Sequence, residues 1–519
     1  MMRSPLYLPA FSLVALCGTM CGQVNVVTAQ YTNYRLNGNS NETVLTAANV
    51  NSLGFGKLFT RSLDGYVYAQ PLYLSSISIN GKTQNVVFVA SMHNTMYAFD
   101  ADDPTASSPL WQVNFGPSVP KPNGYLTPEV GILSTPVIDR ASSTIYAVSQ
   151  TLESGNDVYR LHALDITTGN EKFGGPVVIT GSVPGTGYDN VGGVVTFNAA
   201  KHLQRPALLE AFGNIYIAFG EANGDPYHGW IMAYGAATLQ QTAIFCDTPN
   251  GQRGGIWQSG SGLSADGSYV YVTSADGSAN PGTGSSYIRL TKALQGVDYF
   301  TPASYAFLNY ADYDVGITSP LLIPNLDLVV GGSKNGLVYL MKRSNMGHIV
   351  SGNTQIVQSF QATPVCTALS WQTCFHIHSM VFWSRTQSPS VLYIWGWNDV
   401  LKAYTFQNGI FNTTPVAQNV NGTSNFPGGE LVLSSAGEKA GTAVLWATTS
   451  DGDALNGTVS GTLHAYDASD VSKELWNSNM NPSDKMGNFA KFNTVVVANG
   501  KVYVPTFSNQ IAVYGLLSH

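Results

Sequence analysis

Charged residues are scarce in this sequence. Asp, Glu, Lys and Arg make up 11% of its 519 residues, against about a quarter in ordinary soluble domains. The net charge is −7, and the 24 Lys and Arg residues form no stripe or cluster. Because nucleic-acid binding needs clustered cations beside the phosphates, we exclude a nucleic-acid partner.

Cysteine is also rare, and the motifs that use it are missing. The five cysteines form no Cys-x-x-Cys zinc pair, no Cys-x-x-Cys-His haem segment and no adjacent Cys-Cys pair. A Gly-x-Ser-x-Gly elbow and a phosphate-binding Gly-Lys-Ser/Thr loop are absent as well, which excludes the hydrolase and nucleotide-binding classes that use them. Cys366 and Cys374 could form a disulfide in an oxidising compartment, leaving Cys246 unpaired, but three buried thiols explain the same residues equally well.

Long apolar runs are limited to the N-terminus. Residues 6–17 form a short apolar segment behind Arg3. This pattern predicts a secretory signal peptide over residues 1–22, with cleavage as late as Ala29, and the segment is too short to span a bilayer comfortably. We therefore expect a secreted or periplasmic protein whose mature chain has no transmembrane segment.

Glycine, tyrosine and short apolar segments are abundant, and they form one repeated pattern. Each copy has an apolar strand often headed by Pro, a second strand of the form Val/Ile-Tyr, and a third ending in Tyr-Ala-Tyr/Phe-Asp or a variant of it. A short fourth strand, sometimes with Trp, follows. Such repetition predicts an array of four-stranded units. The copies begin at Gln70, Thr135, Arg205, Trp257, Ser319, His378, Glu430 and Thr494.

The eighth copy lacks its fourth strand. Residues 56–62 fit that position, and a ring of blades must close because exposed strand edges invite aggregation. We therefore predict an all-β fold: a single eight-bladed β-propeller over residues 56–519, closed by an N-terminal strand that completes the last blade. A leader segment over residues 23–55 precedes it.

Two copies carry a family resemblance. Residues 97–101 (Tyr-Ala-Phe-Asp-Ala), followed by Trp111, and residues 161–169 (Leu-His-Ala-Leu-Asp-Ile-Thr-Thr-Gly) resemble the repeats of pyrroloquinoline quinone (PQQ) propellers. These are eight-bladed and similar to quinoprotein alcohol dehydrogenases. The leader over residues 34–45 is also similar to that of a group of secreted bacterial PQQ-like propellers of unsettled activity.

The resemblance implies a cofactor site. Gly254-Gly255-Ile256-Trp257 is similar to the family's Gly-Gly-x-x-Trp, one residue shorter, and this implies that Trp257 lies under the quinone. Lys334 lies in a turn similar to the family's Lys/Arg-Asn-Gly, whose cation contacts the quinone oxygens. The alternatives are a core tryptophan between blades and a solvated turn lysine.

The resemblance also implies a calcium site and a general base. Asp276 replaces the Asn of the family's Gly-Asn-Gly-Ser turn, and a carboxylate suits a hard cation, although a turn-forming Asp needs no metal. Glu221 matches the second ligand, with Asp225 as its rival. Asp312, and after it Asp314, matches the catalytic base, but the Trp that precedes that base in the family is lost.

Two further clusters were considered. Cys374, His376 and His378 alternate as in a strand and could bind copper or zinc, although a structural role is favoured because no distant histidine cluster completes the site. The aromatic segment 395–399 could stack on a sugar, but blade cores also use Trp.

Two functions follow. The first is a binding or scaffold propeller at the cell envelope, with a protein or glycan partner, which the missing haem segment and cysteine pair favour. The alternative is a dehydrogenase that depends on PQQ and calcium and oxidises an alcohol or a sugar. The dehydrogenase would need both cofactors, and the binding propeller would need none. Since propellers host many activities, the fold does not choose between them.

Overall fold

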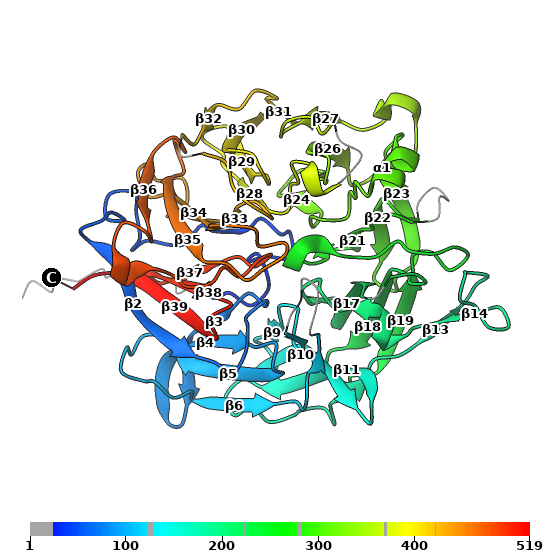
Figure 1. The fold of residues 1–519 in the computed structure, drawn as a ribbon, viewed down its shortest axis with the longest axis horizontal. Helices are drawn as coiled ribbons and strands as arrows, with labels where there is room; N and C mark the ends of the chain where they lie inside the picture. The colour runs from blue at the N-terminus through cyan, green and yellow to red at the C-terminus, as the bar shows by residue number, and fades with distance from the viewer. Residues whose placement is uncertain are drawn as a thin grey trace, which may run out of the picture.

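The computed structural model of the chain describes residues 24–518, except 122–125, 127, 223, 278–282, 368–370 and 421. Its strands form eight blades of four or five strands, arranged in a ring (Figure 1). The predicted all-β, eight-bladed propeller is confirmed. The expected signal peptide lies outside the described residues. Within them, no helix is long and apolar enough to cross a membrane.

The strands of the first four blades follow the order of the chain. Blade 1 contains β3 (Leu72–Ile79), β4 (Lys82–Ala90), β5 (Thr95–Asp100) and β6 (Trp111–Asn114). Blade 2 contains β9 (Val137–Asp139), β10 (Thr144–Glu153), β11 (Asn156–Asp165) and β12 (Val177–Val178). Blade 3 contains β15 (His202–Leu203), β16 (Leu209–Ala211), β17 (Asn214–Glu221), β18 (Trp230–Gly235) and β19 (Gln241–Cys246). Blade 4 contains β20 (Ser264–Ala265), β21 (Tyr269–Thr273), β22 (Tyr287–Thr291) and β23 (Gly296–Phe300).

The other four blades continue in the same way. Blade 5 contains β24 (Leu321–Ile323), β25 (Leu328–Gly331), β26 (Leu337–Lys342) and β27 (Gln358–Gln361). Blade 6 contains β28 (Met380–Trp383), β29 (Ser390–Trp395), β30 (Leu401–Gln407), β31 (Ile410–Phe411) and β32 (Ala417–Gln418). Blade 7 contains β33 (Glu430–Ser434), β34 (Val444–Ser450), β35 (Gly461–Asp467), β36 (Glu474–Asn477) and the leader strand β1 (Gly38–Asn39). Blade 8 contains β37 (Val496–Ala498), β38 (Lys501–Pro505), β39 (Gln510–Leu516) and β2 (Phe55–Ser62).

A few elements lie between the blades. They are the small sheets β7 (Val119–Pro120) with β8 (Glu129–Val130) and β13 (Ser182–Pro184) with β14 (Val194–Thr196), and the helix α1 (Tyr305–Ala311). Single 3-10 turns occur at Ala199–Lys201, Gln258–Gly260, Ser351–Asn353, Trp371–Thr373 and Pro482–Asp484.

The N-terminal strand closes the ring, as predicted. β2 pairs antiparallel with β39, from Phe55 opposite Leu516 to Ser62 opposite Gln510. The Phe55 ring packs 5.0 Å from the Trp476 ring of blade 7. Blade 8 therefore joins the two ends of the chain, and its outer strand is paired along β39.

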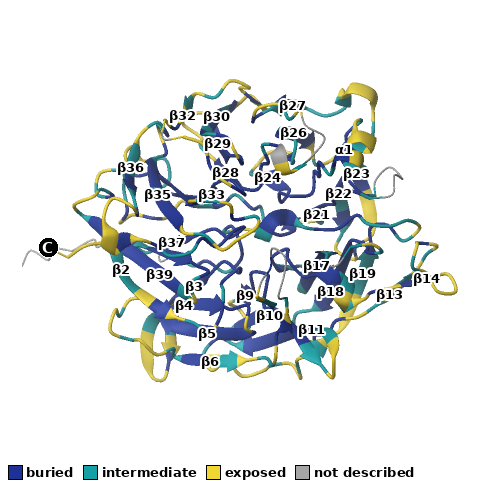
Figure 2. Ribbon diagram, viewed as in Figure 1, coloured by how far each residue is buried: buried dark blue, intermediate teal, exposed yellow. Residues whose placement is uncertain are grey.

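The blades are buried on both faces, which explains their nearly continuous apolar strands. Apolar clusters join neighbouring blades; one extends from Tyr146 of blade 2 to Trp230 of blade 3. Figure 2 shows buried strands throughout the disc, with exposed residues gathered in the rim and the loops.

The fourth strand of blade 2 differs from the prediction. It was expected near residues 171–173, but β12 lies at Val177–Val178. The Glu171 carboxylate instead contacts His162 Nδ1 at 2.5 Å, and His162 Nε2 contacts the Ser149 hydroxyl at 3.0 Å. Blade 7 repeats this clip with Glu474, His464 and Thr449. The clip joins three segments of one blade. Pairing begins at Glu171, which bridges Leu164, and it is interrupted at Phe173 and Gly174, whose φ values are 55° and 75°, before β12.

The leader has a role that the sequence analysis did not foresee. Residues 26–39 contact the innermost strand of each of the eight blades, and in Figure 1 this dark blue segment runs behind the centre of the disc. The hydrogen-bonded pairs are Val26–Tyr73, Val27–Ile138, Asn33–Glu210, Asn33–Ala265, Tyr34–Leu322, Leu36–Phe382, Asn37–Leu433 and Asn39–Val497. The buried Arg35 guanidinium anchors the segment by donating to Leu263 O, Ala29 O and Thr28 Oγ1 at 2.7–3.0 Å. The leader therefore occupies the central channel.

Candidate functional site

One cavity gathers the residues singled out in the sequence. It has a volume of about 650 Å³, within the range of ligand pockets. Its lining includes Trp257, Lys334, Glu221, Asp276, Asp312, Asp314 and the rival ligand Asp225. Two smaller cavities beneath it are lined by His378 together with the leader residue Gln30, and Ser259 lines one of them, so the leader lies below this site.

Loops at the ends of strands position these side chains. Glu221 ends β17, Asp276 follows β21, and Lys334 lies in the turn between β25 and β26. Asp312 is the C-terminal cap of α1 in the left-handed conformation, with φ of 55°. Loops of blades 3, 4 and 5 therefore bring these side chains to one cavity.

Trp257 depends on a glycine for its position. A Cβ atom at Gly220 would lie 3.1 Å from the Trp257 ring, so only glycine fits there without displacing the indole. Trp257 is partly exposed to the cavity and also packs against an apolar cluster that includes Met92, Val130 and Leu203. This arrangement leaves part of the indole available to a ligand.

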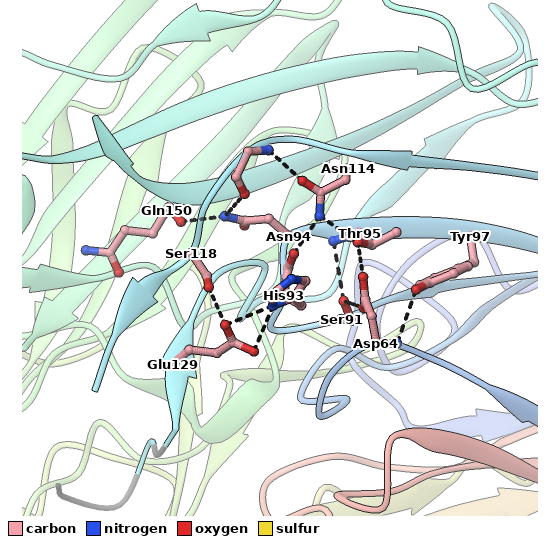
Figure 3. Close-up of polar contacts among 11 residues, drawn as sticks. Asp64, Ser91, His93, Asn94, Thr95, Tyr97, Asn114, Ser118, Glu129 and Gln150 are labelled. Carbon is pink, nitrogen blue, oxygen red and sulfur yellow. Dashed lines mark hydrogen bonds and ion pairs between the residues drawn. The ribbon is translucent and has the colours of Figure 1, made fainter. Parts of the chain in front are cut away.

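A polar network (Figure 3) surrounds the turn that carries Met92, a member of the apolar cluster against which Trp257 packs. In the turn between β4 and β5, the Ser91 hydroxyl donates to Asp64 at 2.6 Å. His93 Nδ1 lies 3.0 Å from Glu129 of β8. Because Met92 lies between Ser91 and His93, the network orders the turn that contributes this residue to the cluster.

Three carboxylates form the centre of the cavity. Oxygen atoms of Asp276, Asp312 and Asp314 lie within 4.8 Å of one another. Lys334 Nζ lies 2.8 Å from Asp312 and 2.5 Å from Asp314, and the second Asp314 oxygen accepts the Asp276 backbone N–H at 2.9 Å. We call these three residues the carboxylate group.

The three carboxylates of this group differ in their pKa values. Burial and the Asp314 charge raise the pKa of Asp312 to about 7, while its side chain remains 43% exposed. Burial would raise the pKa of Asp314, but the Lys334 ammonium holds it below its usual value. Burial and Asp314 raise the pKa of Asp276 to about 6. Asp312 is therefore the exposed carboxylate suited to take a proton near neutral pH.

The candidate cation ligands are arranged differently from the sequence expectation. Arg253 bridges Asp225 and Asp276 at 2.7 and 2.8 Å, and Glu221 accepts the Gly224 N–H at 2.5 Å. Among the described residues, only the carboxylate group brings three such ligands together. Its all-oxygen donors fit a hard cation, with Glu221 at the same cavity but outside the group.

The opposite side of the cavity is aromatic. It is formed by Trp371, His376, His378, Phe426 and Phe492, which we call the aromatic side. The Phe426 and Phe492 rings lie 5.7 and 5.2 Å from the His378 ring. Arg205 also lines the cavity, and its guanidinium lies 3.8 Å from the Phe492 ring centroid.

The alternative metal site at Cys374, His376 and His378 is wrong. Cys374 forms a disulfide with Cys366, and Cys246 is a buried free thiol. Since a disulfide sulfur is no thiolate ligand, the two histidines lack the third donor. The disulfide closes the short segment that carries Trp371.

The aromatic segment 395–399 contributes only indirectly. Trp397 packs behind the aromatic side, 5.1 Å from Phe426 and 5.2 Å from His376, and Trp395 is buried against His464.

Comparison with known proteins gives a fold and no family. No family model and no curated protein matches the chain. Among solved structures, a quinohemoprotein alcohol dehydrogenase from Pseudomonas putida HK5 matches with a TM-score of 0.62 and 13% identity, covering 95% of this chain and 80% of that one. The quinohemoprotein alcohol dehydrogenase from Comamonas testosteroni matches with a TM-score of 0.60, 13% identity and the same coverage.

A third match is a europium-containing methanol dehydrogenase, with a TM-score of 0.58 and 12% identity over 95% of this chain and 98% of that one. At such identities the likeness establishes the shared eight-bladed propeller fold alone. The site residues must be judged from their own geometry.

Proposed function

We propose that this protein binds a flat anionic quinone of the PQQ type together with a hard cation and oxidises an alcohol. The observation that carries the proposal is the convergence of the carboxylate group, Lys334 and Trp257 in one cavity. The shared fold of the quinohemoprotein alcohol dehydrogenases supports it.

Each residue has a role in this proposal. When bound, the quinone supplies the acceptor for the hydride of the alcohol. Trp257 offers a flat apolar surface to such a ring, and Lys334 offers a cation to its oxygens. Asp276 and Asp314 would hold the cation, while Asp312, the most exposed of the three carboxylates, would take the hydroxyl proton of the alcohol.

The cation would be calcium or a trivalent ion of similar size. Carboxylate oxygens suit any hard cation. Three carboxylates in one group favour a higher charge, and one protein of the same fold contains europium. A cation would compete with Lys334 and Arg253, which now neutralise these carboxylates.

A second candidate function is a binding propeller at the cell envelope. Its support is that the three carboxylates already have partners in Lys334 and Arg253, so each carboxylate is paired without a metal. The partner would be a protein or glycan that contacts the same loops. Such a protein would retain neither a cation nor a quinone.

Both proposed functions include export of the chain. The apolar run at residues 6–17 supports a signal peptide. The Cys366–Cys374 disulfide supports a secreted or periplasmic location, since disulfides persist in oxidising compartments.

Terbium luminescence tests the cation site directly. Tb³⁺ is a hard cation that emits when a nearby indole transfers energy to it. We expect emission on titrating the mature protein, loss of emission in the double variant Trp257→Phe/Trp371→Phe, since both indoles line the cavity, and unchanged emission in the control Trp111→Phe, whose indole is in blade 1. Asp314→Asn should weaken binding at least tenfold.

Quinone binding is tested separately. The mature protein is mixed with PQQ and calcium, desalted, and examined for quinone absorbance and for dye reduction with alcohols and aldoses. Retention that is lost in Trp257→Ala supports the dehydrogenase. Absence of both terbium emission and quinone retention contradicts it and favours the binding propeller.

A further inference from the structure

A chain of hydrogen bonds crosses the aromatic side and ends at the cavity. His376 Nε2 lies 2.8 Å from the backbone carbonyl oxygen of Trp371. His376 Nδ1 lies 3.3 Å from His378 Nε2, and His378 Nδ1 lies 2.8 Å from Ser259 Oγ. Ser259 and both histidines line the cavity.

The carbonyl fixes the direction of the first bond in this chain, and the neutral state of both rings then fixes the others. Because a carbonyl oxygen only accepts, His376 Nε2 must carry a proton. Burial, with a contribution from Lys334, lowers the pKa of His376 to about 3, and burial with His376 lowers that of His378 well below its usual value. Both rings are therefore neutral, with one N–H each.

The donor and the acceptor in each of the two remaining hydrogen bonds follow from this. His376 Nδ1 has no proton and accepts from His378 Nε2–H. His378 Nδ1 in turn has no proton and accepts from the Ser259 hydroxyl. With its proton committed to His378, Ser259 Oγ presents only lone pairs to the cavity.

The backbone conformation around Ser259 fixes the position of its hydroxyl oxygen at the cavity. Gln258 and Ser259 have φ of 47° and 40°, a conformation that non-glycine residues adopt rarely. The Ser261 N–H closes this turn on the Gln258 carbonyl at 2.8 Å. Ser259 is 6% exposed, so its oxygen is held at the surface of the cavity.

We infer that the aromatic side is the substrate subsite and that it takes a polyhydroxylated alcohol, a sugar or polyol, with one hydroxyl donating to Ser259. Aromatic rings such as Trp371 and Phe426 cover the C–H face of a sugar, while a fixed acceptor selects a hydroxyl donor. An aliphatic alcohol has a single hydroxyl, and when that hydroxyl donates to Asp312 the Ser259 oxygen is left without a donor, which costs binding free energy. The inference names the substrate class of the proposed dehydrogenase and rests on that function for the reaction, but not for binding.

The first experiment measures the tautomers. Nitrogen-15 correlation spectra of the mature protein, assigned with His376→Gln and His378→Gln, should show both rings neutral with the proton on Nε2 between pH 6 and 8. A proton on Nδ1 of His378, or a charged ring, would overturn the fixed direction and the inference with it.

The second experiment measures binding without any cofactor. Saturation-transfer spectra are recorded with D-glucose, myo-inositol, sorbitol and 1-hexanol. We expect at least one polyol to bind and Ser259→Ala to weaken it by about three- to tenfold. The matched control is Ser379→Ala, since Ser379 is buried beside His378 but accepts the Leu431 N–H outside this cavity.

The outcomes separate the two proposals. No polyol binding, or 1-hexanol bound as tightly as every polyol and unaffected by Ser259→Ala, overturns the inference. Polyol binding sensitive to Ser259 in a protein that retains neither terbium nor PQQ would uphold the subsite and contradict only the dehydrogenase.

Discussion

Glu430 at the start of β33 has a buried carboxyl group. Its oxygen accepts the Phe492 N–H at 3.1 Å, and its side chain lies in the interior beneath the aromatic side. Burial raises its pKa to about 8, although the Phe492 N–H and the Arg205 charge oppose this. The folded protein therefore holds this proton more tightly than the unfolded chain does.

The sign of the pH effect follows by linkage. Below the unfolded pKa of about 4.5 both states are protonated and the stability is fully present. As the pH rises towards 8 the unfolded state loses its proton first, so the free energy of unfolding falls, by on the order of 1 kcal/mol per pH unit. We expect Glu430→Gln to remove this part of the slope in denaturant unfolding between pH 5 and 8. An unchanged slope would contradict the pKa shift.

Asp312 and Asp314 are two residues apart but should differ in their effect on stability. The Asp314 side chain is 4% exposed and pairs with Lys334, so Asp314→Asn leaves a buried ammonium poorly compensated and should cost about 3 kcal/mol or more. The Asp312 side chain is 43% exposed, and Asp312→Asn should cost less than about 1 kcal/mol. Thermal unfolding of both variants measures these costs. Equal losses of stability would contradict a larger contribution from the buried Asp314–Lys334 pair.

At the scale of the element, the disulfide segment is the most informative. The Cys366–Cys374 bond closes the segment that carries Trp371, and the Lys334 ammonium lies 5.3 Å from the Trp371 ring. The Tyr313 hydroxyl also contacts Cys366 Sγ at 2.9 Å. The disulfide thus ties one wall of the cavity to the carboxylate group.

We expect Cys366→Ser/Cys374→Ser to weaken ligand binding at the cavity at least tenfold while costing only about 2 kcal/mol of stability. The reason is that the bond orders Trp371 but lies outside the strand pairing of the blades. Far-ultraviolet circular dichroism measures the fold, and the polyol titration measures the cavity. Unchanged binding would mean that Trp371 is held by its other contacts.

The elements also show what the sequence could and could not predict. Strand periodicity is a local signal, so the blades and the closing strand β2 were predictable. The outer strand of blade 2 was predicted at residues 171–173, but pairing there is interrupted by the positive φ of Phe173 and Gly174, and β12 follows at Val177–Val178. The leader was predicted as a segment but not as the channel filling, since its partners are single backbone groups in eight different blades.

Only part of the candidate site was predictable from the sequence. The carboxylate group lies within one continuous stretch that carries recognisable turns, so Asp276, Asp312 and Asp314 could be named. Ser259, Phe426 and Phe492 carry no motif, and they meet only because the ring brings loops of blades 4, 7 and 8 to one cavity. Such convergence depends on the whole molecule.

At the scale of the whole molecule, the leader and β2 make two separable contributions. Residues 26–39 touch all eight blades from within the channel, whereas β2 pairs only with β39. A chain that begins at residue 43 keeps β2 and loses the channel segment. It should remain monomeric but lose on the order of 5 kcal/mol of stability, because several buried hydrogen bonds and the Arg35 anchor disappear.

A chain that begins at residue 64 also loses β2, and the edge of β39 is then unpaired. An exposed strand edge of this length is a template for intermolecular pairing, so this chain should aggregate, and a peptide covering residues 55–62 should suppress that aggregation. Size-exclusion chromatography and thermal unfolding distinguish the two truncations. If the chain from residue 43 melts at the temperature of the mature protein, the leader merely fills the channel; if the chain from residue 64 stays monomeric, ring closure by β2 is not what protects blade 8.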